Sequence, residues 1–582
     1  MRTTRSLLLV SALLAVGFNS AFNSAFNSAA SGLLAQTPAQ GGVAGHATMD
    51  LAVARADEAG ERPNVIITHR PGSQARLRSY LKNDRIRGEF SNAMAVDLTS
   101  HTARELATNP DVLSISANAK VFGHQVLTGP PPSQSQDIQN LRATLGLVGG
   151  LTGAGVGIAI IDSGVVPTAD LYLSIKAFYD FTNGQQFASI RNDKYGHGTH
   201  VAGLIAGTGL WSGGRYVGVA PGARLTIIKV LDGQGQGYTS DVIRALDFVT
   251  LNREPLGIDI INISLGHPVL EPAATDPLVL AVERASAAGL VVVASAGNFG
   301  TSPATGEVGY AGVASPGNAR SALTVGAIKT FNTVSRVDDE LAPYSSRGPT
   351  WYDGYVKPDV VAPGHGLVAI SDPSTTLYQN AALRAEVAPY LKLSGSSMAT
   401  AVATGVVALM LQANRLDAGS PALTPNTVKA LLQYTSLPLA DDGVDTALEQ
   451  GAGSINAAGA TALAYAINPA APVGTPWVDH AFSPYTVFAG VTHTWSQNIV
   501  WGDNVVWGDT VLWSRAAWAL NIVWGDNVVW DDNVVWGDNV VWGDNVVWGD
   551  NIVWGDNVVW GDNIVWGDNV VWGDVAATSA AQ

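Results

Sequence analysis

Three short segments carry an aspartate, a histidine and a serine in settings suited to acyl transfer. Asp162 ends the apolar run Ile160-Ile161, His197 stands between two glycines in GHGTHVAG, and Ser397 lies in GSSMAT. A serine hydroxyl needs a base to take its proton, and that base needs a buried carboxylate to hold its tautomer and to stabilise the imidazolium. Ser397 also precedes a helical segment, so an oxyanion beside it gains from the positive end of the helix dipole. These residues predict nucleophilic catalysis.

In this order the three motifs resemble those of the subtilisin-like serine proteases (subtilases, peptidase S8). The resemblance implies a serine endopeptidase in which Asp162 orients the base His197 and Ser397 attacks the peptide carbonyl. The family usually continues Met-Ala-Ser-Pro after the nucleophile, whereas this chain reads Met398-Ala399-Thr400-Ala401. The missing proline changes helix geometry slightly and touches no catalytic atom.

Neighbours of the triad could be confused with it or support it. Ser396 is the adjacent hydroxyl, but the family places its nucleophile directly before Met, which favours Ser397. His200 lies one turn after His197, and matching to the family makes it a packing histidine. Ser163 follows the aspartate and is expected to hydrogen-bond its carboxylate, as this position does in subtilases.

A fourth group is needed to stabilise the negative charge that acyl transfer builds on the carbonyl oxygen. One preorganised donor contributes about 3–4 kcal/mol. The segment ASAGN, residues 294–298, matches the one that supplies the oxyanion-hole asparagine in subtilases. The resemblance therefore gives this role to Asn298, together with the N–H of Ser397. Taken alone, an asparagine after glycine is usually a turn residue.

Two further segments are predicted to bind substrate. The resemblance implies that one pairs with the substrate backbone as an added strand, and that the other lines the pocket for the residue before the scissile bond. The first segment is Ser264, Leu265 and Gly266, and the second is Ser295, Ala296 and Gly297. Neither holds an acidic residue that would select Lys or Arg, although Glu307 lies just beyond. We expect broad, non-basic specificity.

The elements that must position these residues alternate between strand and helix from about 137 to 467. The pattern predicts an α/β fold with a doubly wound, mostly parallel sheet of subtilisin type. Strands are predicted at 156–161, 224–230, 259–264, 290–294 and 322–327, and helices at 240–252, 277–288, 397–412 and 457–467. Functional groups collect at the carboxyl ends of such strands, where Asp162 stands.

Residues 62–122 predict a small, ferredoxin-like α/β unit of order β-α-β-β-α-β. Subtilases commonly carry an inhibitory propeptide of this type, so the resemblance implies a zymogen. The unit would assist folding and block the cleft until the enzyme itself cuts the chain between about 118 and 140. The stretch GPPPS at 129–133 is a suitable processing linker. The alternative is an unrelated N-terminal domain.

The first 35 residues predict a signal peptide. Arg2 and Arg5 precede a thirteen-residue apolar run at 6–18, and FNSA then recurs three times at 18–29. We therefore expect a secreted protein, and no transmembrane segment is predicted after the signal. The chain has no cysteine, so no disulfide stabilises it and no thiolate takes part in its chemistry.

The C-terminal part divides into a predicted linker at 468–500 and a hexapeptide repeat at 501–574. From Trp524 to Trp572 a tryptophan recurs every six residues, mostly as WGDNVV. Six is a multiple of the strand period, and Gly-Asp-Asn favours turns, so stacked short strands are expected. Attachment to a surface or polymer, self-association, and calcium binding by the Asp ladder are the functions considered. A structural spacer is the alternative.

Charge and composition limit the kinds of molecule that the chain is expected to bind. The net charge is −16, and twelve aspartates lie in the repeat region, so the chain should repel nucleic acid. The chemistry requires no cofactor. Calcium often stabilises subtilases, but no loop in 140–465 has dense carboxylate spacing, so no ligand is assigned. Polypeptide substrates and the chain's own propeptide are the predicted partners.

Two other functions are weighed against a secreted protease. A surface or adhesive protein could use the protease-like domain as a scaffold, or an active protease could be held at a cell surface by the repeat. Degenerate members of enzyme families usually lose triad residues first. All three triad residues and Asn298 are present, which favours an active enzyme.

Overall fold

The computed structural model describes residues 47–500 together with the short strands at 521–523 and 540–541. The gaps are 91, 127–140, 148–149, 183–186, 189–190, 303–304, 418, 440–445 and 472–477. The predicted signal peptide, the processing linker at 129–133 and most of the repeat region lie outside the described residues.

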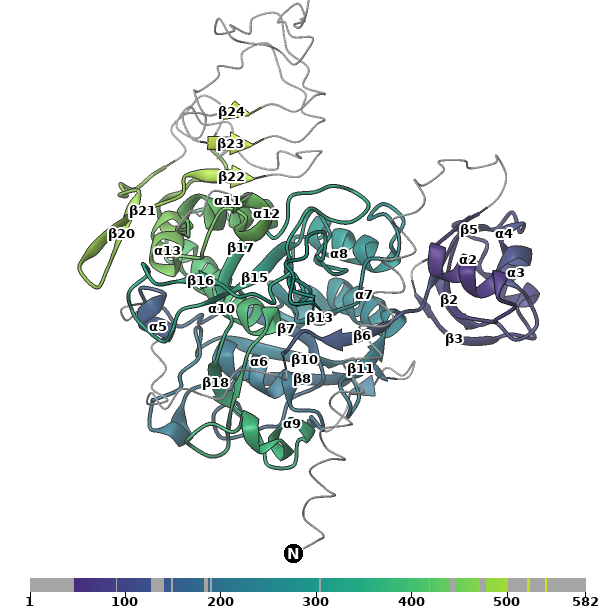
Figure 1. The fold of residues 1–582 in the computed structure, drawn as a ribbon, viewed down its shortest axis with the longest axis horizontal. Coiled ribbons are helices and arrows are strands. Elements are labelled where there is room, and N and C mark those ends of the chain that lie inside the picture. Colours follow the sequence, from purple (N-terminus) through teal and green to yellow (C-terminus); the bar gives the residue numbers. More distant parts are fainter. Residues whose placement is uncertain are drawn as a thin grey trace, which may run out of the picture.

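The N-terminal unit is a sheet with helices on one face, seen in purple beside the larger domain in Figure 1. Its strands β5-β2-β4-β3 follow the order of a ferredoxin-like fold, and β1 adds to this sheet beside β5. The elements are β1 (Thr48–Met49), α2 (Leu51–Glu58), β2 (Asn64–His69), α3 (Gln74–Tyr80), β3 (Arg85–Phe90), β4 (Ala93–Asp97), α4 (Ala103–Ala107) and β5 (Val112–Ala117). The unit thus begins before residue 62.

The predicted mostly parallel α/β sheet of the larger domain is confirmed. Its central path runs β15-β14-β12-β7-β10-β8, and every neighbouring pair along it is parallel. These strands are β7 (Gly157–Asp162), β8 (Ile175–Asp180), β10 (Arg224–Lys229), β12 (Ile260–Ile263), β14 (Val291–Ser295) and β15 (Leu323–Lys329). In all of them except β8, nearly all residues are buried, as strands covered on both faces require.

Helices cover both faces of this sheet. On one face lie α6 (His197–Ala206), α10 (Ser396–Asn414) and α13 (Ala457–Ala466), and on the other α7 (Thr239–Leu256) and α8 (Pro277–Ala287). Side chains of β7 alternate between the two cores: Ile158 and Ile160 pack in the first and Ala159 and Ile161 in the second. Of the described helices, α10 alone is long and apolar enough to cross a membrane, and it is buried inside the domain.

Shorter elements complete the domain. They are α5 (Leu141–Thr144), β9 (Phe187–Ala188), η2 (Leu210–Ser212), β16 (Glu340–Leu341), β17 (Val360–Pro363), β18 (Leu367–Ile370), α9 (Thr376–Gln379), η3 (Ala381–Leu383), β19 (Tyr390–Leu393), α11 (Pro425–Thr435) and α12 (Thr446–Gln450). A separate three-stranded sheet is formed by β6 (Lys120–Gly123), β11 (Gln236–Tyr238) and β13 (Leu265–Gly266), in the order β11-β6-β13.

A fully buried ion cluster links three segments of this domain. The Asp359 carboxylate lies 2.8 Å from the Lys357 ammonium and 2.9 Å from the Lys429 ammonium, and it accepts the N–H of Thr324 at 2.7 Å. Burial lowers the pKa of Lys357, because an ammonium loses its hydration there. The cluster joins β17 to α11 and to the start of β15.

The interpretation of 468–500 as a linker does not hold beyond residue 478. This stretch contains a hairpin, β20 (Tyr485–Phe488) with β21 (Val491–Thr494), and then the buried Trp495. The Trp495 ring stacks on Phe482 with 5.7 Å between centroids, and its Nε1–H donates to Thr486 Oγ1 at 2.8 Å. This stretch is folded because Trp495 packs beside α11 and α13, which buries its ring. Trp495 stands six residues before Trp501, which is the spacing of the repeat.

Three short parallel strands follow the hairpin. They are β22 (Asn498–Val500), β23 (Asn521–Val523) and β24 (Val540–Val541), which lie above one another in Figure 1. Like residues pair, since Asn498 is opposite Asn521 and Ile499 is opposite Ile522. Val540 is opposite Ile522, three hexapeptides further along the chain. The fold and role of the repeat as a whole stay predictions.

Candidate active site

Asp162 is the last residue of β7 and is completely buried. Its two carboxylate oxygens lie 2.8 Å and 2.9 Å from Nδ1 of His197. Oδ1 also accepts the N–H of Ser163 at 2.7 Å. The expected contact from the Ser163 hydroxyl is not the one observed: that oxygen accepts the N–H of Gly198 at 2.9 Å and so ties β7 to the start of α6.

His197 is the first residue of α6 and is also completely buried. The glycine after it allows the helix to approach the sheet, because a Cβ at Gly198 would stand 2.2 Å from the carbonyl oxygen of Gly164. Nε2 of His197 has no hydrogen-bond partner among the described residues. Its imidazole is thus held by the carboxylate on one side, with a ring nitrogen available for a hydroxyl on the other.

His200 is one turn further along α6 and points elsewhere. Its Nε2 lies 3.2 Å from the carbonyl oxygens of Leu367 and Leu391, in β18 and β19. Burial lowers the pKa of His200 to about 3, so the ring is neutral at ordinary pH. It packs α6 against these strands.

Ser397 is the second residue of α10. Its backbone N–H donates to the carbonyl oxygen of His124 at 3.2 Å, and its Oγ–H donates to the carbonyl oxygen of Ser264 at 2.8 Å. The hydroxyl therefore points at β13 rather than at His197 in this structure. Ser396 differs, since its Oγ accepts the N–H of Gly297 at 3.2 Å.

Asn298 lies in the turn after β14. Its Oδ1 accepts the N–H of Ser396 at 2.9 Å, which fixes the side-chain amide beside the start of α10. The preceding Gly297 has a φ of 103°, a left-handed conformation that favours glycine and brings the turn close to Ser346. The amide NH2 is directed away from the Ser396 bond.

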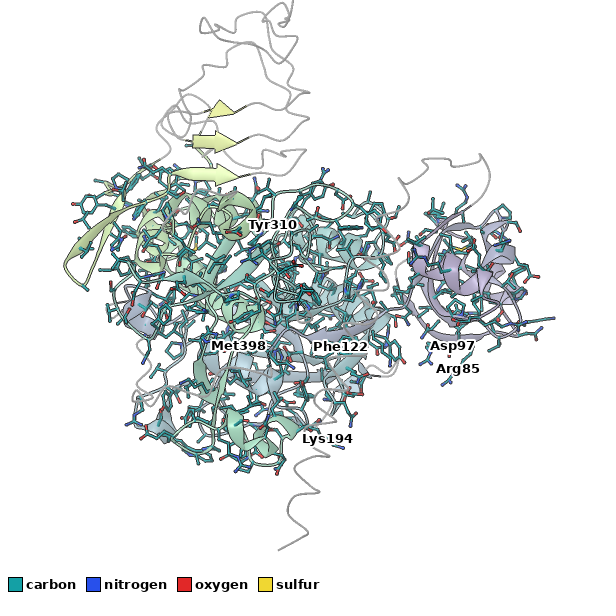
Figure 2. The ribbon with its side chains drawn as sticks, viewed as in Figure 1. Arg85, Asp97, Phe122, Lys194, Tyr310 and Met398 are labelled. Atoms are coloured by element: carbon teal, nitrogen blue, oxygen red, sulfur yellow. The ribbon has the colours of Figure 1, made fainter. Side chains whose placement is uncertain are left out.

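The chain's own strand β6 lies between β11 and β13 and passes close to the ring of His197. Gly123 pairs with Leu265 and Phe122 with Gly266, both antiparallel, while Phe122 also pairs with Gln236 of β11. Figure 2 shows Phe122 and, in α10, Met398, the residue that follows Ser397. The segment predicted to receive an added strand therefore receives one, which comes from the end of the N-terminal unit.

Just over half of the chain, residues 153–454, matches the model of the subtilase family (peptidase S8). The chain belongs to the subtilase family of serine endopeptidases.

Curated relatives agree with this subtilase assignment. Serine protease AprX of Bacillus subtilis (strain 168) is 40% identical over 314 residues, which are 53% of this chain and 66% of AprX. Subtilisin DY of Bacillus licheniformis is 32% identical over 292 residues, which are 50% of this chain and 87% of that relative. The match thus spans slightly less than two thirds of AprX.

A solved structure shares the fold. Fervidolysin from Fervidobacterium pennivorans, a keratinolytic enzyme related to subtilisin, superposes with a TM-score of 0.54 at 21% sequence identity. The superposition covers 72% of this chain and 63% of fervidolysin. At this identity the likeness concerns the subtilase fold alone.

The three residues predicted to line the substrate pocket differ in whether they bond to His124, the residue that follows β6. Ser295 Oγ lies 2.7 Å from Nδ1 of His124, whereas Ala296 donates its N–H to Val325 and Gly297 donates to Ser396. Glu307 is exposed, and its carboxylate accepts a hydrogen bond from the Thr305 hydroxyl at 3.1 Å.

Sequence reasoning missed the residues that fill the cleft. The predicted N-terminal unit ends at residue 122, and residues 123–126 have no predicted role beyond lying in the range 118–140 where cleavage is expected. The run Val121-Phe122-Gly123 has the composition of a short strand, but its partners are more than a hundred residues away. Among the described residues, no three His, Asp or Glu side chains are grouped to hold a metal ion.

Proposed function

We propose that this subtilase hydrolyses peptide bonds through an acyl-enzyme, with Ser397 as nucleophile, His197 as base and Asp162 as its orienting carboxylate. One observation carries the proposal: a peptide lies across the start of α10 with the carbonyl oxygen of His124 on the N–H of Ser397, beside the buried Asp162–His197 pair. A carbonyl oxygen on this N–H supports the proposal, because attack at its carbon builds negative charge on that oxygen.

The first half of the reaction uses the two ring nitrogens of His197. Rotation of the Ser397 side chain away from Ser264 brings Oγ to the unpartnered Nε2, which takes the hydroxyl proton as Oγ attacks. Asp162, on Nδ1, stabilises the resulting imidazolium. The imidazolium then protonates the leaving amine, and water releases the acyl group by the same steps in reverse.

Negative charge on the carbonyl oxygen meets two donors in this proposal. One is the N–H of Ser397, which already bonds to a peptide carbonyl. The other is the amide NH2 of Asn298, whose orientation is held by the bond from Ser396 N–H to Oδ1. Donors that are fixed before the reaction need no reorganisation when charge develops.

The N-terminal unit acts as an inhibitory propeptide in this scheme, so the chain is made as a zymogen. Ile66, Phe90, Ala93 and Ala95 of the unit belong to the same hydrophobic cluster as α7 and α8. Because β6 also fills the cleft, no other peptide can reach Ser397 until the unit leaves. The apolar run at 6–18 supports secretion of this precursor.

A covalent serine reagent tests the nucleophile directly. The mature protein is treated with a fluorophosphonate, and the labelled peptide is located by mass spectrometry while digestion of an unstructured protein is followed. Labelling of Ser397 with parallel loss of digestion supports the proposal. Digestion that persists after complete labelling, or label on another residue, contradicts it.

Replacing Asn298 with alanine should lower kcat by about a hundredfold to a thousandfold, because one oxyanion donor is lost. KM should change little, since the donor acts mainly on the charged intermediate. Steady-state kinetics on a peptide substrate separate the two constants. An equal loss through KM would mean that Asn298 only shapes the turn beside Ser396.

Replacing Asn118 with alanine should weaken inhibition by the N-terminal unit about fivefold to tenfold. Asn118 Oδ1 accepts the N–H of Ser240 at 2.9 Å and its Nδ2 donates to Ser240 Oγ at 3.0 Å, so it caps α7, whose own N-cap Tyr238 makes no side-chain bond. The measurement is the time at which activity appears after the precursor is purified. Asn83→Ala, at an exposed position of the same unit, is the matched control.

A further inference from the structure

The main chain around residue 124 is held on both sides of one peptide bond. The His124 N–H donates to the carbonyl oxygen of Ser264 at 3.1 Å, and its carbonyl accepts the N–H of Ser397 at 3.2 Å. On the far side, the Val126 N–H donates to the carbonyl oxygen of Ser394 at 2.7 Å, forming an antiparallel bridge. The bond that spans the gap between these anchors is His124–Gln125.

We propose that His124–Gln125 is the bond at which the precursor cuts itself, and that the pocket around His124 selects a neutral imidazole. This inference rests on the proposed function. Ser397 Oγ bonds to the carbonyl carbon of His124, and the C–N bond to Gln125 breaks as its nitrogen takes the proton held by His197. Water then cleaves the ester, leaving a carboxylate on His124 and a new amino terminus at Gln125.

The pocket fits an uncharged histidine ring. His124 is only 5% exposed, its Nδ1 lies 2.7 Å from Ser295 Oγ, and Phe299 presents an edge to the ring with centroids 6.4 Å apart. The space is tight, because a Cβ at Gly266 would stand 2.9 Å from Cε1 of the ring. A hydroxyl can donate a hydrogen bond to a neutral imidazole or accept one from it, so the Ser295 hydroxyl can recognise the neutral ring.

Charge inside this pocket is unfavourable. The titratable groups that face the ring are His197, at the start of α6, and His267, which follows β13, and neither supplies a negative charge. Burial and these two histidines lower the pKa of His124 to about 3. His124 Nε2 also has no partner among the described residues, so a proton there would stay unpaired.

Two neighbouring positions also restrict the sequence that fits. A side chain on Gly123 would meet the ring of His197, since a Cβ there stands 3.2 Å from Nδ1 and Cε1. Val121 is buried in the same hydrophobic cluster as Leu231 and Leu265. The preferred sequence is therefore an apolar residue, any residue, glycine and histidine before the bond.

The first test uses the full precursor, as wild type and as Ser397→Ala, purified from the same host. Intact mass and N-terminal sequencing should show a wild-type fragment that begins at Gln125 and a partner fragment that ends at His124, while the variant stays whole. A start elsewhere in a protein that digests casein would overturn the inference and leave the proposed function standing. The same cut in the variant would show a host protease and overturn it as well. If the wild type is not cut and does not digest casein, both the inference and the proposed function are wrong.

The second test measures the pocket with peptides. The processed enzyme receives the peptide of residues 120–126, Lys-Val-Phe-Gly-His-Gln-Val, and versions with Phe or Lys in place of the histidine. Between pH 8 and pH 5.5 the ratio of kcat/KM for the His peptide to that for the Phe peptide should fall about tenfold, because a free imidazole with a pKa near 6.5 becomes charged. The Phe peptide carries no titratable side chain at this position, so effects of pH on the enzyme itself cancel in the ratio.

The Lys peptide supplies the remaining comparison. Its kcat/KM should be about a hundredfold below that of the His peptide at pH 8, since the pocket would bury an unpaired charge. A His-to-Phe ratio that does not change with pH, or a Lys peptide cut as fast as the His peptide, would overturn selection of a neutral imidazole.

Discussion

The Ser397→Ala precursor is expected to remain uncut and to lose peptide hydrolysis by about a millionfold, the size of loss seen when an enzyme of this type loses its nucleophile. The substitution removes a single oxygen, which among the described residues bonds to the carbonyl of Ser264. The fold should therefore survive. Chain mass over time, together with release of peptides from an unstructured protein, measures both effects.

Ser396→Ala is the matched control, because it removes the adjacent hydroxyl from the same helix. That change costs one hydrogen bond, from the N–H of Gly297, and leaves Ser397, His197 and Asp162 in place. It should keep most of the activity and still process itself. If the Ser396 variant were inert and the Ser397 variant active, the assignment of the nucleophile would be wrong.

The second large effect concerns stability. Asp359→Asn should lower the free energy of unfolding by about 3–5 kcal/mol, because two buried lysines would lose the carboxylate that pairs with both of them. The Asp359 carboxylate lies within 3 Å of the ammonium groups of Lys357 and Lys429 and also accepts the N–H of Thr324. Guanidinium unfolding should be measured in the Ser397→Ala background, so that self-digestion does not remove the unfolded chains.

Glu386→Gln is the control for this comparison. Glu386 pairs with Arg215 at 3.3 Å, but the Glu386 side chain is 63% exposed. Exposed pairs contribute about 0–1 kcal/mol, so this variant should unfold almost like its parent. An equally small effect at Asp359 would mean that the buried cluster adapts, for example by loss of a lysine proton.

The motifs of the predicted site and the parallel strands were both found from local patterns, and of these the parallel sheet is confirmed. Asp162, His197 and Ser397 each lie in a motif whose glycines and apolar neighbours set the local backbone, and the parallel strands are nearly continuous apolar runs. Such features can be found without knowing which segments meet. The structure then brings Asp162 and His197 together within hydrogen-bond distance.

What the sequence did not predict depends on contacts between distant segments. The pairing of β6 with β11 and β13 joins residues that no local pattern relates, and a strand of four residues carries little signal alone. The buried position of Trp495 likewise follows from Phe482 and Thr486, not from its own hexapeptide. The direction of a hydroxyl, as at Ser163, follows from which N–H lies nearest.

Under the proposed function, the position of β6 between β11 and β13 also predicts how selective the mature enzyme would be. When residues 120–124 depart, two facing rows of peptide N–H and C=O groups are left one strand apart. Any extended polypeptide can join both rows, whatever its side chains, so the main chain supplies a sequence-blind part of the affinity. Selection between substrate sequences then depends on the few positions where the substrate side chain is closely surrounded by the enzyme. In this structure those positions are occupied by Val121, Gly123 and His124. We therefore expect such an enzyme to tolerate many sequences and to reject a few sharply.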